Sequence, residues 1–177
     1  MGDGQPLVDN RKLRLSRFPP FPTHPPPMLR QHLDRLELTT TGEGFHDLTA
    51  QLGASLAATG LRLGVLHLAV LHTSCSLTIN ENADPRVLQD LTACLRALVP
   101  QEGVRPISGE GPLRAWDHDD EGPDDMPAHV RTALTATNLS LSFEGGRLLL
   151  GTWQAVYLWE HRSRPHRRQL SAHWIGS

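Results

Sequence analysis

The sequence predicts an α+β domain in which largely antiparallel sheets are combined with about three helices. Residues 62–71 are almost all aliphatic, which is typical of a central strand covered on both faces. Near the C-terminus, residues 139–143 and 147–150 flank Glu144-Gly145-Gly146, the pattern of a hairpin. Two more strand patterns follow, at residues 154–161 and 169–174. Such a meander is antiparallel, which excludes a doubly wound nucleotide-binding fold.

The other elements follow from periodicity and from turn residues. Residues 36–41 suggest a first strand, and residues 45–59 carry leucines at helical spacing. Asp84 and Pro85 open a second helix that ends near residue 98, because proline is favoured at the first helical position. Further elements are a strand at 76–80, a long loop at 100–123 with a short strand at 113–116, and a third helix at 126–136.

Length and proline content predict one domain preceded by an extension. A chain of 177 residues that is 38% hydrophobic can bury one substantial core. Seven of its fourteen prolines lie in the first 27 residues, where neither a helix nor a sheet interior can form easily. We therefore assign residues 1–33 to a proline-rich extension and residues 34–177 to the domain.

Charge and cysteine content limit the partners and the compartment. The net charge of −2 gives no positive field for nucleic acid or an anionic membrane, so neither is expected as a partner. No apolar run approaches the roughly 20 residues that span a bilayer. Cys75 and Cys94 lack the spacing of a disulfide framework, so a reducing compartment, the cytoplasm, is expected.

The first segment with chemical potential is HTSCSLTINENADP, residues 72–85, which directly follows the aliphatic strand. Its imidazole, hydroxyls, amides and carboxylate can bind a small polar ligand, with His72 as acid or base. The alternative is structural: hydroxyls satisfy backbone groups at a strand bend, and Asp84 caps the next helix. The ligand-binding candidates are Ser76, Asn80, Glu81 and Asn82.

The second segment is HDDEGPDDMPAH, residues 118–129. Its histidines and acids could ligate zinc or a harder divalent ion, or form an acid/base pair. His129 falls in the first turn of the expected helix, where an anion such as phosphate can dock. The alternative is that the acids are ordinary charges at a helix start. The candidates are His118, Glu121, Asp125 and His129.

The third segment is GTWQAVYLWEHR, residues 151–162. Its aromatic side chains are expected in the core or an interface rather than in an aromatic binding box. Glu160 and His161 are better site candidates. A basic tail could clamp phosphate, although a solvated basic turn is the commoner meaning of such a run. The tail consists of Arg162, Arg164, His166, Arg167 and Arg168.

Together the three segments resemble the signatures of the YjbQ family over nearly all of residues 34–177. The resemblance implies a YjbQ-like α+β fold, a homotrimer, and membership of a group described as secondary thiamine-phosphate synthases. Departures from the family pattern are Cys75, Ala155 and the turn at residues 163–168. The family's polar positions correspond here to His72, Ser76, Asn80, Glu81, Asn82, His118, Glu121, Gly122, Asp125, His129, Gly151, Thr152, Trp153, Gln154, Glu160 and His161.

Three functional hypotheses follow. The first is an enzyme of the thiamine-phosphate synthase type with weak or secondary activity, acting on a small phosphorylated metabolite. The second is a metal-dependent hydrolase of such a metabolite, and the third is a non-catalytic trimeric ligand-binding module. The expected roles are catalysis by His72, Glu121, His129 and His161, zinc or magnesium binding by His118, Glu121 and His129, and ligand binding by Ser76, Asn80, Glu81, Asn82, Asp125, Thr152, Gln154, Arg167 and Arg168.

Overall fold

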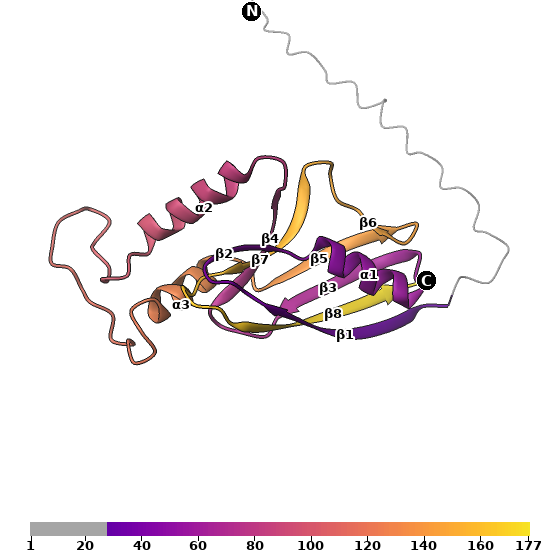
Figure 1. Ribbon diagram of the computed structural model, residues 1–177, viewed down its shortest axis with the longest axis horizontal. Coiled ribbons are helices and arrows are strands. Elements are labelled where there is room, and N and C mark those ends of the chain that lie inside the picture. The colour runs from indigo at the N-terminus through magenta and orange to yellow at the C-terminus, as the bar shows by residue number, and fades with distance from the viewer. Residues whose placement is uncertain (1–27) are drawn as a thin grey trace, which may run out of the picture.

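The computed structural model describes residues 28–177, so the proline-rich run at residues 1–27 lies outside the described residues (Figure 1). The strands are β1 Arg30–Thr39, β2 Gly44–Asp47, β3 Leu63–Val70, β4 Cys75–Glu81, β5 Asn138–Glu144, β6 Arg147–Leu148, β7 Gln154–Glu160 and β8 Arg167–Gly176. The helices are α1 Thr49–Thr59, α2 Pro85–Leu98 and α3 Asp125–Leu134.

The strands form two sheets in which every pairing is antiparallel. A five-stranded sheet has the order β1-β8-β3-β5-β6, and a three-stranded sheet has the order β2-β7-β4. The longest pairing runs along β1 and β8, from Arg30 opposite Gly176 to Thr39 opposite Arg167. The predicted α+β class, with antiparallel sheets and three helices within residues 28–177, is confirmed.

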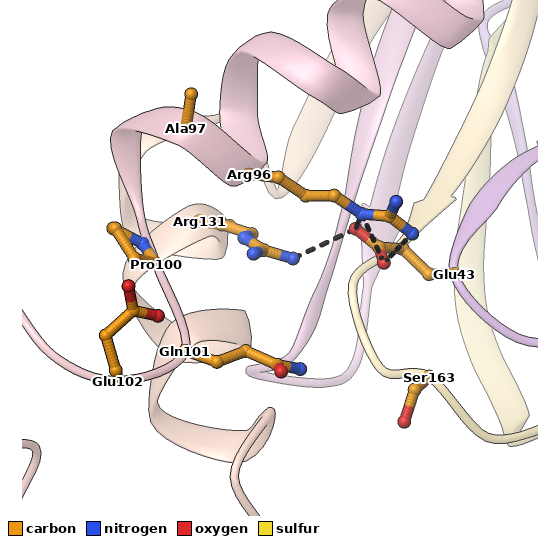
Figure 2. Close-up of a pocket in the computed structure, with 8 residues that line it drawn as sticks. All are labelled: Glu43, Arg96, Ala97, Pro100, Gln101, Glu102, Arg131 and Ser163. Atoms are coloured by element: carbon orange, nitrogen blue, oxygen red, sulfur yellow. Dashed lines mark hydrogen bonds and ion pairs between the residues drawn. The ribbon is translucent and has the colours of Figure 1, made fainter.

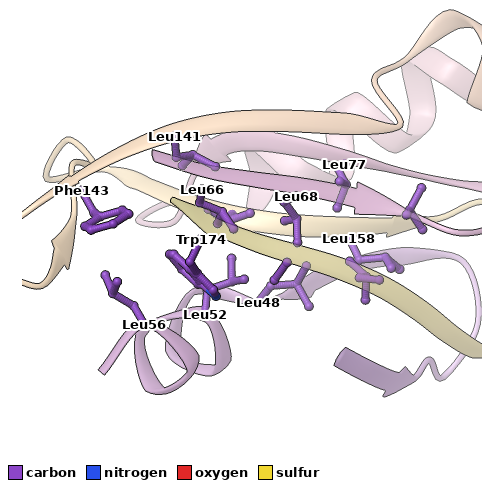
Figure 3. Packing of buried hydrophobic residues seen from close by; sticks show 14 of the residues in the cluster. Leu48, Leu52, Leu56, Leu66, Leu68, Leu77, Leu141, Phe143, Leu158 and Trp174 are labelled. Carbon is purple, nitrogen blue, oxygen red and sulfur yellow. The ribbon is translucent and has the colours of Figure 1, made fainter. Parts of the chain in front are cut away.

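The core lies where α1 and the two sheets meet (Figure 3). Leucines at helical spacing on and just before α1 are fully buried, as are inward-facing residues of β3 and β8. The Trp174 ring packs edge-on against Phe143, and its Nε1–H donates to the Ser55 hydroxyl at 2.8 Å. Each such fully buried leucine stabilises the fold by about 2 kcal/mol of apolar transfer. Those drawn in Figure 3 include Leu48, Leu52, Leu56, Leu66 and Leu68.

Two sequence predictions about individual elements are wrong. Residues 45–47 were expected in the first helix but belong to β2, which pairs with β7, and α1 begins only at Thr49. The Asp47 carboxylate accepts the Thr49 backbone N–H at 2.7 Å and so starts the helix after the strand. Residues 113–116 do not form a strand; only Arg114 makes an isolated bridge, to Val104.

The cover of the two faces of β3 differs from the prediction. The aliphatic run indicated cover on both faces, but within residues 28–177 only one face is covered. Leu63 is 57% exposed and Val65 37% exposed on the outer face, whereas Leu66 and Leu68 are buried on the inner one. β1 also begins at Arg30, four residues before the predicted domain boundary.

α2 forms as predicted, but it is set apart from the sheets (Figure 1). The Asp84 side chain accepts the Arg86 backbone N–H at 2.9 Å, which caps the helix, and Pro85 occupies its first position. Leu95 is its one buried residue. No helix of residues 28–177 is both long enough and apolar enough to cross a membrane.

Candidate metal centre

Three side chains of the second segment converge at one point. His118, Asp125 and His129 each offer a ligand atom, and these atoms lie within 4.8 Å of one another. His118 Nε2 is 2.9 Å from Asp125 Oδ2, and His129 Nε2 is 3.7 Å from Asp125 Oδ1. The arrangement is a compact group of two imidazoles and one carboxylate.

Helical spacing accounts for two of these positions. Asp125 opens α3 and His129 lies four residues later, so the two side chains share one face of the helix. His118 comes from the loop before α3. The Asp125 side chain is only 3% exposed, whereas His118 is 51% exposed and His129 31% exposed. The carboxylate therefore forms the buried side of the cluster, and the imidazoles form the side that solvent can reach.

A hydrogen bond outside the cluster orients His129. Its Nδ1 lies 2.9 Å from the backbone carbonyl oxygen of Thr73, in the turn between β3 and β4. A carbonyl only accepts, so Nδ1 carries a proton and Nε2 is the ring nitrogen left to bind a metal ion. Metal-ligating histidines in proteins are oriented in this way by a carbonyl or carboxylate.

Arg162 holds Asp125 from the buried side. Its Nη1 forms an ion pair with Asp125 Oδ1, and its Nη2 donates to the Glu121 backbone carbonyl at 2.9 Å. Its Nε lies 3.3 Å from Asp124 Oδ2. The Arg162 side chain is 8% exposed, so these contacts fix the carboxylate with little freedom to rotate.

The donor set suits a divalent ion such as zinc. Two imidazoles and one carboxylate are the protein ligands of many catalytic zinc sites, and they leave coordination positions for water and substrate. The predicted residues His118 and His129 are brought together here. The Glu121 side chain is 73% exposed and lies outside the cluster, 3.5 Å from Arg162. Asp125 takes the acidic position instead.

His72 lies in a groove beside the cluster. The groove has a volume of about 500 Å³ and is shared by His72, His129 and several threonines. His72 Nε2 accepts the Gln169 backbone N–H at 2.8 Å, so its proton sits on Nδ1. Burial, together with the charge of Arg168, lowers the pKa of His72 and keeps the imidazole neutral. The remaining polar lining includes the threonines Thr73, Thr132, Thr135 and Thr137.

His161 is buried away from solvent. It is 1% exposed, and its Nε2 lies 2.9 Å from the Ser76 hydroxyl. Burial and the charge of Arg131 lower the pKa of His161 to about 3. At neutral pH it is therefore an uncharged member of the interior.

Glu160 and Arg168 form a fully buried ion pair. Arg168 Nη2 lies 2.6 Å from Glu160 Oε1, and both side chains are at most 4% exposed. Thr40 donates to the same carboxylate at 3.0 Å, and Arg168 donates to the Ser74 hydroxyl at 3.0 Å. The other predicted phosphate ligand, Arg167, pairs with Glu37. Both guanidinium groups are thus matched by carboxylates of the chain.

The remaining predicted positions lie at the far end of β4 and β7. Cys75 pairs with Glu160 at one end and Glu81 with Gln154 at the other, six residues or about 20 Å away. There the side chains support the turn: Asn82 donates to the Gln154 carbonyl at 3.4 Å, and Gln154 Oε1 accepts the Gly151 N–H at 2.7 Å. Asn80, Glu81, Asn82, Thr152 and Gln154 belong to this end of the subunit.

Comparison with known proteins identifies the family. The family model described as "UPF0047 protein YjbQ-like" matches residues 34–177. A UPF0047 protein of Synechocystis sp. is 44% identical over 83% of this chain and 93% of its own length. The UPF0047 protein YjbQ of Escherichia coli O157:H7 is 38% identical over 77% of this chain and 92% of its own. The chain belongs to the YjbQ-like UPF0047 family.

Two solved structures have the same fold. A conserved hypothetical protein from Thermus thermophilus has a TM-score of 0.63 at 38% identity, over 80% of this chain and 97% of that one. A YbjQ-like protein of unknown function from Sulfolobus solfataricus has a TM-score of 0.72 at 18% identity, over 85% of this chain and 100% of that one. The predicted family and its YjbQ-like fold are confirmed.

In this YjbQ-like chain, sequence reasoning missed two parts of the cluster. The Thr73 carbonyl is a backbone group and leaves no trace in the sequence. Arg162 was grouped with the basic tail, although it directly follows Glu160 and His161 at the end of the third segment. The spacing of Asp125 and His129 could have indicated a shared helical face, because residues four apart are neighbours on a helix.

Proposed function

We propose that this protein is a metal-dependent hydrolase of a small phosphate ester, with a divalent ion held by His118, Asp125 and His129. One observation carries the proposal: the two imidazoles and the buried carboxylate converge within 4.8 Å, and His129 is oriented through Thr73. A divalent ion bound there would acidify a coordinated water molecule, so that hydroxide forms near neutral pH, and would polarise a phosphoryl oxygen.

The chain's own groups have separate roles in this proposal. Arg162 keeps the Asp125 carboxylate in one orientation, and the Thr73 carbonyl keeps His129 in one tautomer. His72 lines the adjoining groove as a neutral imidazole whose Nδ1–H can donate to a bound molecule. The threonine hydroxyls of the groove supply further hydrogen bonds that orient the substrate.

The ion pairs that Arg167 and Arg168 form within the chain favour hydrolysis over thiamine-phosphate synthesis. A synthase of that type must stabilise a departing pyrophosphate, for which guanidinium groups are well suited. Arg168 is instead buried against Glu160, and Arg167 is paired with Glu37. The residues of the described part of the chain that line the groove beside His129 are threonines, histidines, Val70 and Ala133, with no arginine among them.

The test is metal-dependent turnover. Protein stripped with a chelator is reloaded separately with Zn²⁺, Mn²⁺ or Mg²⁺ and assayed on a panel of small phosphate monoesters. We expect turnover that requires metal and that falls by about 100-fold or more in His118→Ala and His129→Ala. His173→Ala, on the outer face of the large sheet, is the matched control and should retain activity. Turnover that survives chelation would refute the proposal, and stoichiometric metal binding without turnover would favour a binding module.

A further inference from the structure

Residues 100–117, between α2 and α3, form a flap that projects away from the two sheets (Figure 1). Within residues 28–177, every hydrogen bond and ion pair of the flap joins two of its own residues. The backbones of Val104 and Arg114 bond to each other at 2.9 and 3.0 Å, and Trp116 Nε1 donates to the Pro100 carbonyl at 3.1 Å. These bonds close the flap on itself and leave it unattached to the sheets.

The flap contributes little to the buried interior. Gly103 is the one buried residue among residues 100–117, and a Cβ there would collide with Arg114 and Ala115 of the flap itself. Pro100 and Trp116 are partly buried, and the other flap residues are exposed. A segment with so few buried contacts opens at a much lower free energy than the whole domain unfolds.

The chain is held firmly just before the flap begins. Val99 is 3% exposed, and its backbone carbonyl accepts Arg131 Nη2 at 2.9 Å. The Glu43 carboxylate in turn holds Arg131 at 2.9 Å and Arg96 at 2.7 Å. Figure 2 shows these contacts and, beside them, the first flap residues, 100–102, which take no part in them. The end of α2 is thus fixed, and the freedom of the chain begins at the flap.

His118, directly after the flap, is the next residue that bonds to another part of the described domain. Its Nε2 lies 2.9 Å from Asp125 Oδ2, and its ring centroid lies 5.5 Å from that of His129. Gly122 then turns the chain with a φ of +116°, a backbone conformation that favours glycine, before Asp125 opens α3. The far end of the flap is therefore joined to the metal centre through one imidazole.

We infer that a metal ion at this centre holds the flap in place through His118, and that the flap opens when the ion leaves. The inference rests on the metal centre of the proposed function. Asp125 and His129 belong to α3, whereas His118 comes from the end of the flap, so one bound ion joins the flap to the helix. The free energy of metal binding is then also free energy of flap closure. Opening removes one of the two imidazoles on the solvent side of the cluster.

Thermodynamic linkage makes the inference quantitative. An ion that binds the closed flap more tightly than the open one lowers the population of the open flap by the same factor. His118→Ala keeps Asp125 and His129 and so reproduces the ligand set of the open flap. The ratio of zinc affinities between the wild type and His118→Ala should therefore match, within about threefold, the factor by which zinc protects the flap.

The experiment is limited proteolysis of the full chain by trypsin, with and without saturating Zn²⁺. Arg114 is the flap's one site for trypsin, because proline follows Arg105. It lies four residues before His118, so a protease that grips the chain on both sides of the cut must pull His118 free. The rate of cleavage after Arg114 then follows the population of the open flap.

We expect Zn²⁺ to slow cleavage after Arg114 by about tenfold or more in the wild type and by less than about twofold in His118→Ala. Asp119→Asn, at the exposed neighbour of His118, is the matched control and should be protected like the wild type. Cleavage after the exposed Arg147 of β6 is the internal reference, and zinc should not change its rate.

The possible failures separate this inference from the proposed function. Stoichiometric zinc binding with unchanged cleavage after Arg114 would overturn the inference and leave the metal centre standing. No zinc binding would overturn both. Equal protection of the wild type and His118→Ala would show that zinc acts without His118, which also overturns the inference. A melting curve for each variant checks that it is folded.

Discussion

The imidazole of His129 and the backbone carbonyl of Thr73 are joined by a 2.9 Å hydrogen bond across 56 residues of sequence. The bond connects α3 to the turn between β3 and β4, and it leaves Nε2 of His129 as the ring nitrogen that faces Asp125. In this way the position of the sheet determines the tautomer of a proposed metal ligand.

Arg162→Gln is expected to weaken zinc binding without abolishing it. The substitution removes the ion pair that fixes Asp125, and loss of such an outer contact typically costs 10- to 100-fold in metal affinity, about 1.4 to 2.7 kcal/mol. Competition with a chromophoric chelator measures the affinity. Arg164→Gln, an exposed change two residues away, serves as the control. Equal affinities in both variants would show that Arg162 has no part in the site.

Arg168→Met is expected to destabilise the fold strongly, by about 3 to 5 kcal/mol, because it leaves Glu160 buried without its partner. The double variant with Glu160→Leu should lose much less, since two well-packed apolar side chains replace the pair. Urea denaturation gives the free energies of unfolding of the wild type, the two single variants and the double variant. Simple addition of the two single losses would contradict the coupling that we infer.

The free energy of unfolding should fall as the pH is lowered from about 6.5, and His161 should contribute to that fall. Burial lowers the pKa of His161 from 6.5 to about 3, so between these values the unfolded chain binds a proton there that the folded chain does not. The contribution is at most about 1.4 kcal/mol per pH unit, and it is absent above pH 6.5. Replacement of His161 by glutamine keeps a donor and an acceptor for Ser76 but removes the titrating group. It should make the free energy of unfolding depend less on pH between pH 6.5 and 4. His173→Gln is the control, and identical slopes for the wild type and His161→Gln would contradict this account.

Replacement of Gly64 and of Gly53 by alanine should have opposite effects on the stability of the fold. A Cβ on Gly64 would lie 2.0 Å from the Ile175 carbonyl oxygen and 2.8 Å from the Phe143 ring, so Gly64→Ala must push β3 from β8. We expect a loss of about 2 kcal/mol or more. A Cβ on Gly53, in α1, meets nothing within 4 Å, and Gly53→Ala should stabilise by about 0.5 to 1 kcal/mol. Thermal melts compare the two, and a stable Gly64→Ala protein would contradict this packing.

Local sequence patterns predicted the elements that are determined by residues close to them in the chain. The helix from Pro85 follows from Asp84 and proline at its start, and the hairpin of β5 and β6 follows from Gly145 and Gly146. β2 was missed because its four residues are a strand only through pairing with β7, a contact between residues more than 100 positions apart. The exposure of the outer face of β3 could not be predicted either, because its residues are aliphatic whether or not they are covered.

The candidate site was predicted in part. His118 and His129 come together as expected because both belong to one short segment that ends in a helix. Sequence proximity could not separate Glu121 from Asp125, because the path of the loop between Glu121 and the first residue of α3 decides which carboxylate faces the histidines. The turn residues Asn82 and Gln154 share motifs with the site but lie at the other end of a strand pair, where alternation and register place them.

Zinc titration of metal-free protein, with Asp125→Asn and Glu121→Gln measured in parallel, tests the proposed metal centre most directly. We expect about one tightly bound ion per chain in the wild type, at least about tenfold weaker binding in Asp125→Asn, and wild-type affinity in Glu121→Gln, whose side chain is 73% exposed. Fewer than about one ion per three chains, or equal affinity in the wild type and Asp125→Asn, would contradict a metal site built on His118, Asp125 and His129.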